Sequence, residues 1–202
     1  MYKEETLPFY VSPGDAPAKQ ELLKAALHLF VRDGLCETSI RAIAAEAGYS
    51  NPAIFKHFDT KEALALHLFE RCYRRLSSEL YSALDPARPF PANLHGLIER
   101  FAGLLDENSD AFLYVQDTLR LFWPKVAPAL RRHSLIGLLK RLVQAGVREG
   151  EVASGVSEDL LVAAMAGFLS QFARALYFGE LSGNAKDWVP AIEQTLRRMV
   201  RP

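Results

Sequence analysis

The stretch "GYSNPAIFKHF", residues 48–58, decides the fold, because it interrupts two helical patterns with a short, stiff segment. The preceding "TSIRAIAAEA" and the following "TKEALALHLFERCYRRL" both place apolar side chains three or four positions apart, as on one face of a helix. Gly48 is suited to ending a helix in the left-handed conformation, and Pro52 fits the first turn of the next. Two short helices joined by such a turn form a helix-turn-helix, whose second helix enters the DNA major groove.

The pattern extends toward the amino terminus. Residues 17–33 place Leu23, Leu27 and Phe30 on one face of a helix, and Gly34 follows as a stop signal. We therefore expect a three-helix DNA-binding domain over residues 17–64. Residues 1–16 contain two prolines and a glycine and are predicted to form a flexible tail.

The remaining chain also has helical patterns, and no alternating strand pattern with hairpin turns is present. A long fourth helix is expected from Thr60 to Leu84, and the prolines of "DPARPFP", residues 85–91, stop it. The sequence thus predicts an all-α protein of about nine helices, with a regulatory domain over residues 65–202. The later helices are expected at residues 93–107, 109–123, 126–149, 157–179 and 186–201.

Charge does not create a global attraction to nucleic acid, because the 202 residues contain 24 basic and 24 acidic side chains. Residues 16–75 contain nine bases and seven acids, so any attraction to DNA has to be local. The longest apolar run, residues 160–169, is shorter than a membrane span of about 20 residues. We expect a soluble, intracellular protein with no membrane partner.

The sequence offers little for catalysis. No nucleophile–base pair, phosphate loop, carboxylate pair or metal-ligand spacing occurs in a motif, so we predict no enzyme activity, no cofactor and no metal site. Cys36 and Cys72 cannot form a disulfide framework. Redox sensing by either cysteine is the weaker interpretation, because nothing nearby indicates a depressed thiol pKa.

Residues 19–64 resemble the DNA-binding domain of the tetracycline-repressor (TetR) family through "LLKAALHLFVRDG", "TSIRAIAAEAGYS" and "IFKHFDTKEAL". The resemblance implies a homodimeric transcriptional regulator, usually a repressor, that is released from a palindromic operator by a small ligand. It implies a cytoplasmic, nucleoid-associated protein whose partners are double-stranded DNA, a second copy of itself and an effector.

The resemblance also implies roles for individual side chains. Asn51, Pro52, Ala53 and Lys56 would face bases, and Tyr49 would either contact phosphate or pack in the turn. The family most often has tyrosine at Phe55, so one phosphate contact is replaced there by packing against sugar or a thymine methyl group. The residues expected on or near the DNA backbone are Thr38, Ser39, Arg41, Ser50, Phe55, His57 and Lys61.

Aromatic side chains at helical spacing in the second half of the chain fit a packed core, and also fit a hydrophobic ligand pocket. Gln116 is polar within an otherwise apolar face and needs partners, which either a ligand or a backbone carbonyl could supply. We expect a hydrophobic or aromatic effector near this face. The candidate pocket residues are Phe101, Phe112, Gln116, Leu119, Trp123, Phe168 and Phe172.

Two late helices are expected to form a four-helix dimer seam with a second chain. Small residues along 160–176 permit a close approach of helices, and 186–201 offers an apolar stripe; packing of both stripes within one chain is the alternative. The candidate interface residues are Ala163, Ala166, Gly167, Ser170, Trp188, Ile192, Leu196 and Met199.

Two functions remain in consideration. The first is a ligand-responsive repressor, and the second is a DNA-binding protein of the same fold that a protein partner controls without a small effector. The DNA-binding segment is common to both, so they differ only in what the second half of the chain binds.

Overall fold

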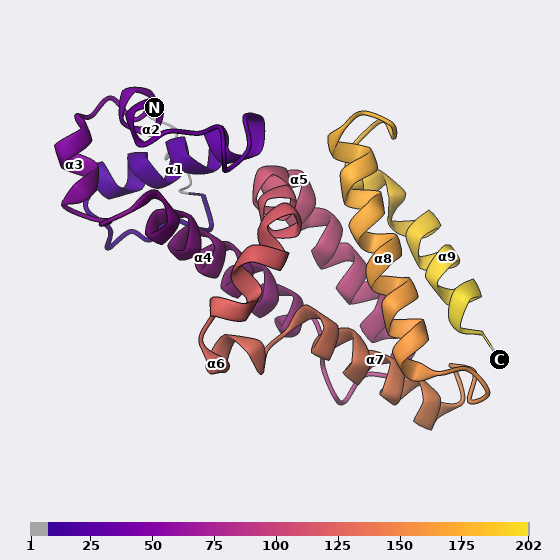
Figure 1. Cartoon of the computed structure of the whole chain (residues 1–202). Helices are drawn as coiled ribbons and strands as arrows, with labels where there is room; N and C mark the ends of the chain where they lie inside the picture. Colours follow the sequence, from indigo (N-terminus) through magenta and orange to yellow (C-terminus); the bar gives the residue numbers. More distant parts are fainter. Residues whose placement is uncertain (1–7, 202) are drawn as a thin grey trace. The chain divides into compact units, whose positions relative to one another are not determined.

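The computed structural model describes residues 8–201, with Ala53 described without its side chain. The described residues form nine α-helices and two 3-10 helices and contain no strand, which confirms the predicted all-α class (Figure 1). The elements are α1 (Pro17–Arg32), α2 (Ile40–Glu46), α3 (Asn51–Phe55), α4 (Lys61–Ser82), α5 (Phe90–Phe122), η1 (Trp123–Lys125), α6 (Pro128–Arg131), α7 (Leu135–Glu149), α8 (Glu158–Tyr177), η2 (Ala185–Trp188) and α9 (Val189–Val200).

The chain divides into two compact units. Unit 1 contains the residues up to Arg75 and Asp110–Val126, and unit 2 contains Leu76–Ser109 and the residues from Ala127 onward. The boundary differs from the division expected between residues 64 and 65, because most of α4 and the second half of α5 pack with the first three helices.

The core of unit 1 fixes α1, α2 and α3 as a three-helix head (Figure 1). Leu23 of α1, Ile43 of α2 and Ile54 of α3 are all completely buried, and they are the apolar residues that the helical periodicity selects. Phe58, just beyond α3, is also buried. A short α3 of five residues is held in place by this packing rather than by its own helix stability.

Residues 8–16 are folded onto unit 1, so the flexible tail predicted over 1–16 is wrong for this part; residues 1–7 lie outside the described residues. Val11 is buried, and Arg71 of α4 donates hydrogen bonds to the backbone oxygen of Tyr10 and to the carboxylate of Asp15. The apolar stretch gains burial and the charges gain partners, which together offset the entropy of ordering the segment.

The second half of α5 completes unit 1. The Tyr114 ring stacks on Phe30 with ring centroids 5.8 Å apart, and its hydroxyl donates a 2.8 Å hydrogen bond to the backbone oxygen of Ala65. Burial raises the pKa of Tyr114 well above its usual value, so the hydroxyl stays a donor. This side chain therefore ties α5 to both α1 and α4.

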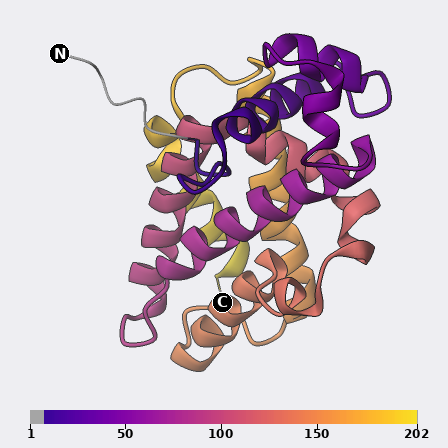
Figure 2. The ribbon, with the colours of Figure 1, turned by 90° about the vertical axis from the view of Figure 1, so that its left-hand side faces the viewer.

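Unit 2 contains the end of α4, the first half of α5 and helices α6 to α9, with α7 and α9 both packed against α8 (Figure 1). A short connection joins the end of α4 to the start of α5 (Figure 2). Phe90 is almost completely buried. A Cβ at Gly146 of α7 would lie 2.7 Å from its ring and 2.4 Å from Val152, so this contact requires glycine.

Two helix boundaries differ from the prediction. The helices expected at 93–107 and 109–123 form one element with a kink at Asn108 (φ −145°, ψ 44°), which is also where the chain crosses from unit 2 to unit 1. The helix expected at 126–149 is interrupted. Ser134 accepts a hydrogen bond from the backbone N–H of Gly137 and so begins α7 as a new helix.

By length and composition α8 could cross a membrane, with a mean hydropathy of 1.4 over its most apolar window. A core helix of a folded protein passes the same test, and α8 contacts α7 and α9. Only 28% of that window is buried in the single chain, so much of this apolar helix is left uncovered.

Candidate DNA-binding surface

The turn between α2 and α3 has the geometry that the sequence predicts. Ser39 caps α2 by accepting a 3.0 Å hydrogen bond from the backbone N–H of Ala42. Gly48 has φ of +73°, which only glycine adopts at little cost, and it turns the chain toward α3. Pro52 lies in the first turn of α3, and α3 ends at Phe55.

Most side chains proposed for DNA contact lie on the solvent side of this turn and of α3. Phe55 is 51% exposed and Tyr49 is 38% exposed, so both rings are accessible to a partner surface. His57 is half-buried, and the side chain of Ala53 lies outside the described part of the structure. The exposed candidates are Ser39, Arg41, Tyr49, Ser50, Asn51, Pro52, Phe55 and Lys56.

Positive charge is available on this surface. Arg41 on α2 and Lys56 at the end of α3 make no ion pair with any described residue, and α3 itself contains no acidic residue. A cation that has no partner in the protein keeps its full attraction for phosphate. This surface can therefore attract DNA locally although the chain as a whole is neutral.

Thr38 does not belong to the exposed surface, which corrects its predicted place at the DNA backbone. Its side chain is 2% exposed, and its hydroxyl is 2.8 Å from the backbone oxygen of Gly34 and 3.1 Å from that of Leu29. Both oxygens belong to the end of α1 and the loop after it. Thr38 therefore secures the start of α2 from inside.

Lys61, predicted on or near the DNA backbone, is partly buried and makes its hydrogen bonds within the chain. Its ammonium group donates hydrogen bonds to three backbone oxygens, those of Leu35, Cys36 and Thr38, at 2.9, 3.2 and 2.8 Å. An ammonium group has three N–H donors, so all of them are engaged by backbone oxygens of the same chain. The charge of Lys61 is thereby directed at the loop before α2.

The residues proposed for an effector pocket are divided between the two units. Phe112, Gln116, Leu119 and Trp123 belong to unit 1, where Phe112 is buried, Leu119 is 40% exposed and the Trp123 ring lies 4.9 Å from that of Tyr73. In unit 2, the rings of Phe101 and Phe172 lie 6.4 Å apart, and Phe168 is half-buried. Phe112, Trp123, Phe101 and Phe172 therefore take part in packing within their units.

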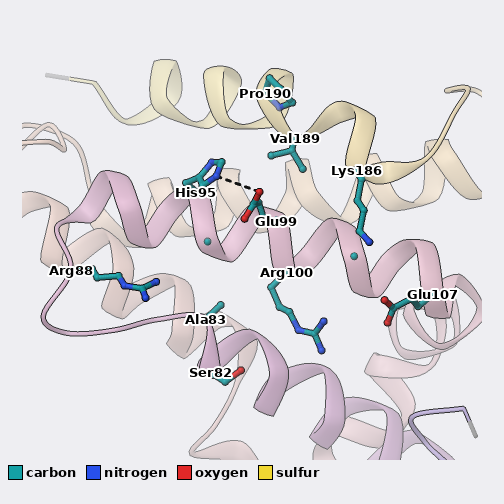
Figure 3. A pocket seen from close by; sticks show the side chains of 12 residues that line it. Ser82, Ala83, Arg88, His95, Glu99, Arg100, Glu107, Lys186, Val189 and Pro190 are labelled. Carbon is teal, nitrogen blue, oxygen red and sulfur yellow. Dashed lines mark ion pairs between the residues drawn. The ribbon is translucent and has the colours of Figure 1, made fainter. Parts of the chain in front are cut away.

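Unit 2 has an open groove of about 800 Å³ between α5 and the η2–α9 segment (Figure 3). Its charges are largely paired: Arg100 binds Glu79, and His95 lies 2.8 Å from Glu193 and 3.4 Å from Glu99. The hydrogen bond to Glu193 raises the pKa of His95. A groove lined by paired charges is unlike the apolar pocket predicted from the sequence.

A second groove of about 460 Å³ lies in unit 2 between the 84–88 turn and α7. Arg88, Arg141 and Arg148 line it, and the Arg141 guanidinium lies over the Tyr81 ring at 5.5 Å. Neither of the two grooves is lined by any of the seven residues proposed for the effector.

The eight residues proposed for the dimer interface fall into two groups. On α8, Ala163 and Gly167 are exposed and Ala166 and Ser170 are half-buried. Met199 on α9 is exposed, and Trp188 at the end of η2 is half-buried. Ile192 and Leu196 are each 1% exposed in the single chain, which corrects their assignment: they pack in the core of unit 2 and leave no surface for a second chain.

Comparison with known proteins agrees with the geometry of the head. Residues 22–68 match the family described as "Bacterial regulatory proteins, tetR family". Among curated relatives, the HTH-type regulator YerO of Bacillus subtilis is 40% identical over 52 residues, which span 26% of this chain and 18% of YerO. The HTH-type transcriptional activator FasR of Mycolicibacterium smegmatis is 27% identical over 111 residues, 55% of this chain and 51% of FasR.

Longer matches have lower identity. The HTH-type transcriptional repressor KstR2 of Rhodococcus jostii is 24% identical over 155 residues, which span 73% of this chain and 74% of that protein. Two solved structures share the fold. The ketosteroid transcriptional regulator KstR2 of Mycobacterium tuberculosis has a TM-score of 0.81 at 18% identity, and the match covers 98% of this chain and 100% of that chain. The regulator FadR of Bacillus subtilis in complex with stearoyl-CoA has a TM-score of 0.70 at 15% identity, and the match covers 91% of this chain and 100% of that chain. The helix-turn-helix formed by α2 and α3 therefore lies within the segment that matches the tetR family of bacterial regulatory proteins.

Proposed function

We propose that the protein is a ligand-responsive repressor that binds a palindromic operator in the cytoplasm as a homodimer. The observation that carries the proposal is the surface of α2 and α3, where Arg41 and Lys56 are exposed without an ion pair among the described residues. Asn51 and Lys56 are of the types that hydrogen-bond base edges in the major groove.

The second copy follows from the weakness of a single head. Three or four phosphate contacts bind DNA weakly at cellular salt, whereas two heads on one palindrome add their binding energies. α8 supplies a suitable surface, because Leu160 is 63% exposed and the adjacent Ala163 and Gly167 leave room for a partner helix. We propose α8 as the main interface helix, with Met199 of α9 and Trp188 of η2 at its edge.

An effector would act through the helix that the two units share. Residues 61–75 of α4 belong to unit 1 and residues 76–82 belong to unit 2. Because α4 is one continuous helix, a displacement of its segment in one unit is transmitted to its segment in the other. The effector must bind the DNA-free state more tightly, because equal affinity for both states shifts nothing. We propose that the effector is a hydrophobic or aromatic compound. FadR, which shares the fold, was solved in complex with stearoyl-CoA, a ligand with a long apolar acyl chain.

The experiment is binding of the purified protein to genomic DNA fragments, followed by footprinting of the enriched sites. A palindromic footprint with two half-sites about 34–36 Å apart supports the proposal. Binding that shows no preference among fragments would contradict it.

The effector part is tested separately by titrating the operator complex with hydrophobic compounds. The Gln116→Ala and Trp123→Ala variants should respond with altered potency to compounds that release the wild type. If no compound releases any of the three proteins, the alternative function, control by a protein partner, is favoured.

A further inference from the structure

We infer that Lys61 is a positioning residue that fixes the start of α2, and that it does not contact DNA. The inference deepens the proposed function and rests on it only where DNA binding is the measured quantity. It concerns a hydrogen-bond cluster in unit 1 that joins the first residue of α4 to the loop between α1 and α2.

The loop creates the need for such a residue. Between the end of α1 and the start of α2 the chain makes a compact turn, in which the backbone oxygens of Leu35, Cys36 and Thr38 have no backbone donor among the described residues. Three oxygens that converge on one point make a negative site, which a single ammonium group can satisfy with its three donors. Lys61 fills this site with bonds of 2.8 to 3.2 Å.

Through Thr38, the hydrogen-bond cluster of Lys61 holds the start of α2 in place. Thr38 directly precedes Ser39, the N-cap of α2, so the Lys61 bond to Thr38 fixes the residue from which α2 starts. Thr38 is held from the other side by its own hydroxyl, which bonds to the oxygen of Gly34. The start of α2 is thereby bound to α1 through Thr38 and to α4 through Lys61.

A displacement of α2 would also move the DNA-reading elements, because α2 carries the exposed Arg41 and packs against α3. Lys61 thus acts on DNA through other residues. Arginine is a poor replacement, because its planar, fork-shaped guanidinium does not match three oxygens around one point. A phosphate contact would have the opposite preference, since arginine binds phosphate at least as well as lysine.

The experiment compares Lys61→Met, Lys61→Arg and the control Arg41→Met with the wild type. Operator affinity is measured across salt concentrations, and hydrogen–deuterium exchange is measured for the α2 amides. If Lys61 positions α2, both Lys61 variants bind about tenfold more weakly, a loss of about 1.4 kcal/mol, and exchange faster in α2, while the salt dependence keeps the wild-type slope. Arg41→Met should reduce the slope by about 0.9 and leave exchange unchanged.

Other results overturn the inference. It is wrong if Lys61→Arg binds like the wild type, or if Lys61→Met reduces the salt slope by about 0.9 with unchanged exchange. Should Lys61→Met fail to fold, Lys61→Arg still distinguishes the two roles. If the wild type binds no DNA, the proposed function fails, but the α2 exchange rates of the Lys61 variants still decide the positioning role.

Discussion

Asp15, just before α1, and Arg71, on α4, form a two-pronged ion pair across 56 residues of sequence, with Arg71 Nη2 2.9 Å from one carboxylate oxygen. The Asp15 side chain is only 7% exposed, and it also binds Lys19 at 3.1 Å. Although burial acts to raise the pKa of Asp15, hydrogen bonds from Arg71, Ser12 and Lys19 hold it well below its usual range. This pair fastens the beginning of α1 to α4.

Replacing Arg71 with methionine should destabilise the protein by about 1.5–3 kcal/mol, the range for a hydrogen-bonded charge whose partner stays buried. Urea unfolding at neutral pH measures the loss. Arg32→Met is the matched control, because the Arg32–Asp33 pair is exposed and should change stability by less than about 0.5 kcal/mol. Equal effects of the two variants would contradict a structural role of the Asp15–Arg71 pair.

His67 should make the stability of the fold depend on pH. Its ring lies 5.2 Å from that of Phe58, and its Nε2 is buried with no hydrogen-bond partner. Burial, followed by the charges of Lys19 and Arg71, lowers the pKa of His67 to about 4. The unfolded chain binds this proton more readily, so stability is complete above the unfolded pKa of about 6.5 and falls as the pH decreases toward 4.

The test replaces His67 with leucine, which cannot titrate, and measures urea unfolding between pH 4 and 7. The variant should lose less stability than the wild type on acidification across this window. His28→Gln is the control, since His28 is exposed on α1. A wild-type slope that persists in His67→Leu would assign the pH dependence to other groups.

Gly146→Ala should destabilise unit 2 by about 1–3 kcal/mol, because the added methyl group has no room beside Phe90 and Val152. Thermal unfolding measures the effect. Gly96→Ala serves as control: its Cβ would meet the Ala83 oxygen at an ordinary 3.5 Å, and alanine favours a helix over glycine by up to about 1 kcal/mol. The prediction fails if both variants are as stable as the wild type.

Gly167→Arg should convert the proposed dimer into a monomer, because a long charged side chain would stand on the exposed face of α8. In the single chain a Cβ at Gly167 meets nothing within 4 Å, so the fold itself can accept the substitution. Gly155→Arg, in the loop before α8, adds the same charge to an equally open position and should leave the dimer intact. Sedimentation at micromolar concentration measures both.

Lys56→Ala should reduce discrimination between operator and random DNA by about 1–3 kcal/mol, the value of a good contact to a base edge. Arg41→Ala should instead weaken binding to all sequences and flatten the salt dependence. Fluorescence anisotropy with operator and scrambled DNA at several salt concentrations measures both effects. An equal loss for operator and scrambled DNA in Lys56→Ala would show that Lys56 contacts phosphate.

Local patterns in the sequence determined the helices and the DNA-binding turn. Ser39, Gly48 and Pro52 act through the backbone of their nearest neighbours, so their positions alone predict where α2 begins, where it ends and where α3 begins. Leu23, Ile43 and Ile54 were predictable as core residues for the same reason, because helical periodicity assigns each side chain to a face.

Only the tertiary structure decided which polar side chains form hydrogen bonds within the protein and which apolar side chains pack in its core. Lys61 matches the family pattern of a DNA-backbone contact, yet its donors are taken by oxygens 23 to 26 residues away. Asp15 finds Arg71 at a separation of 56 residues, and Ile192 and Leu196 fill the core of their own chain. Periodicity and spacing record the relation between near neighbours, whereas a hydrogen bond or a burial between distant residues depends on how the helices pack.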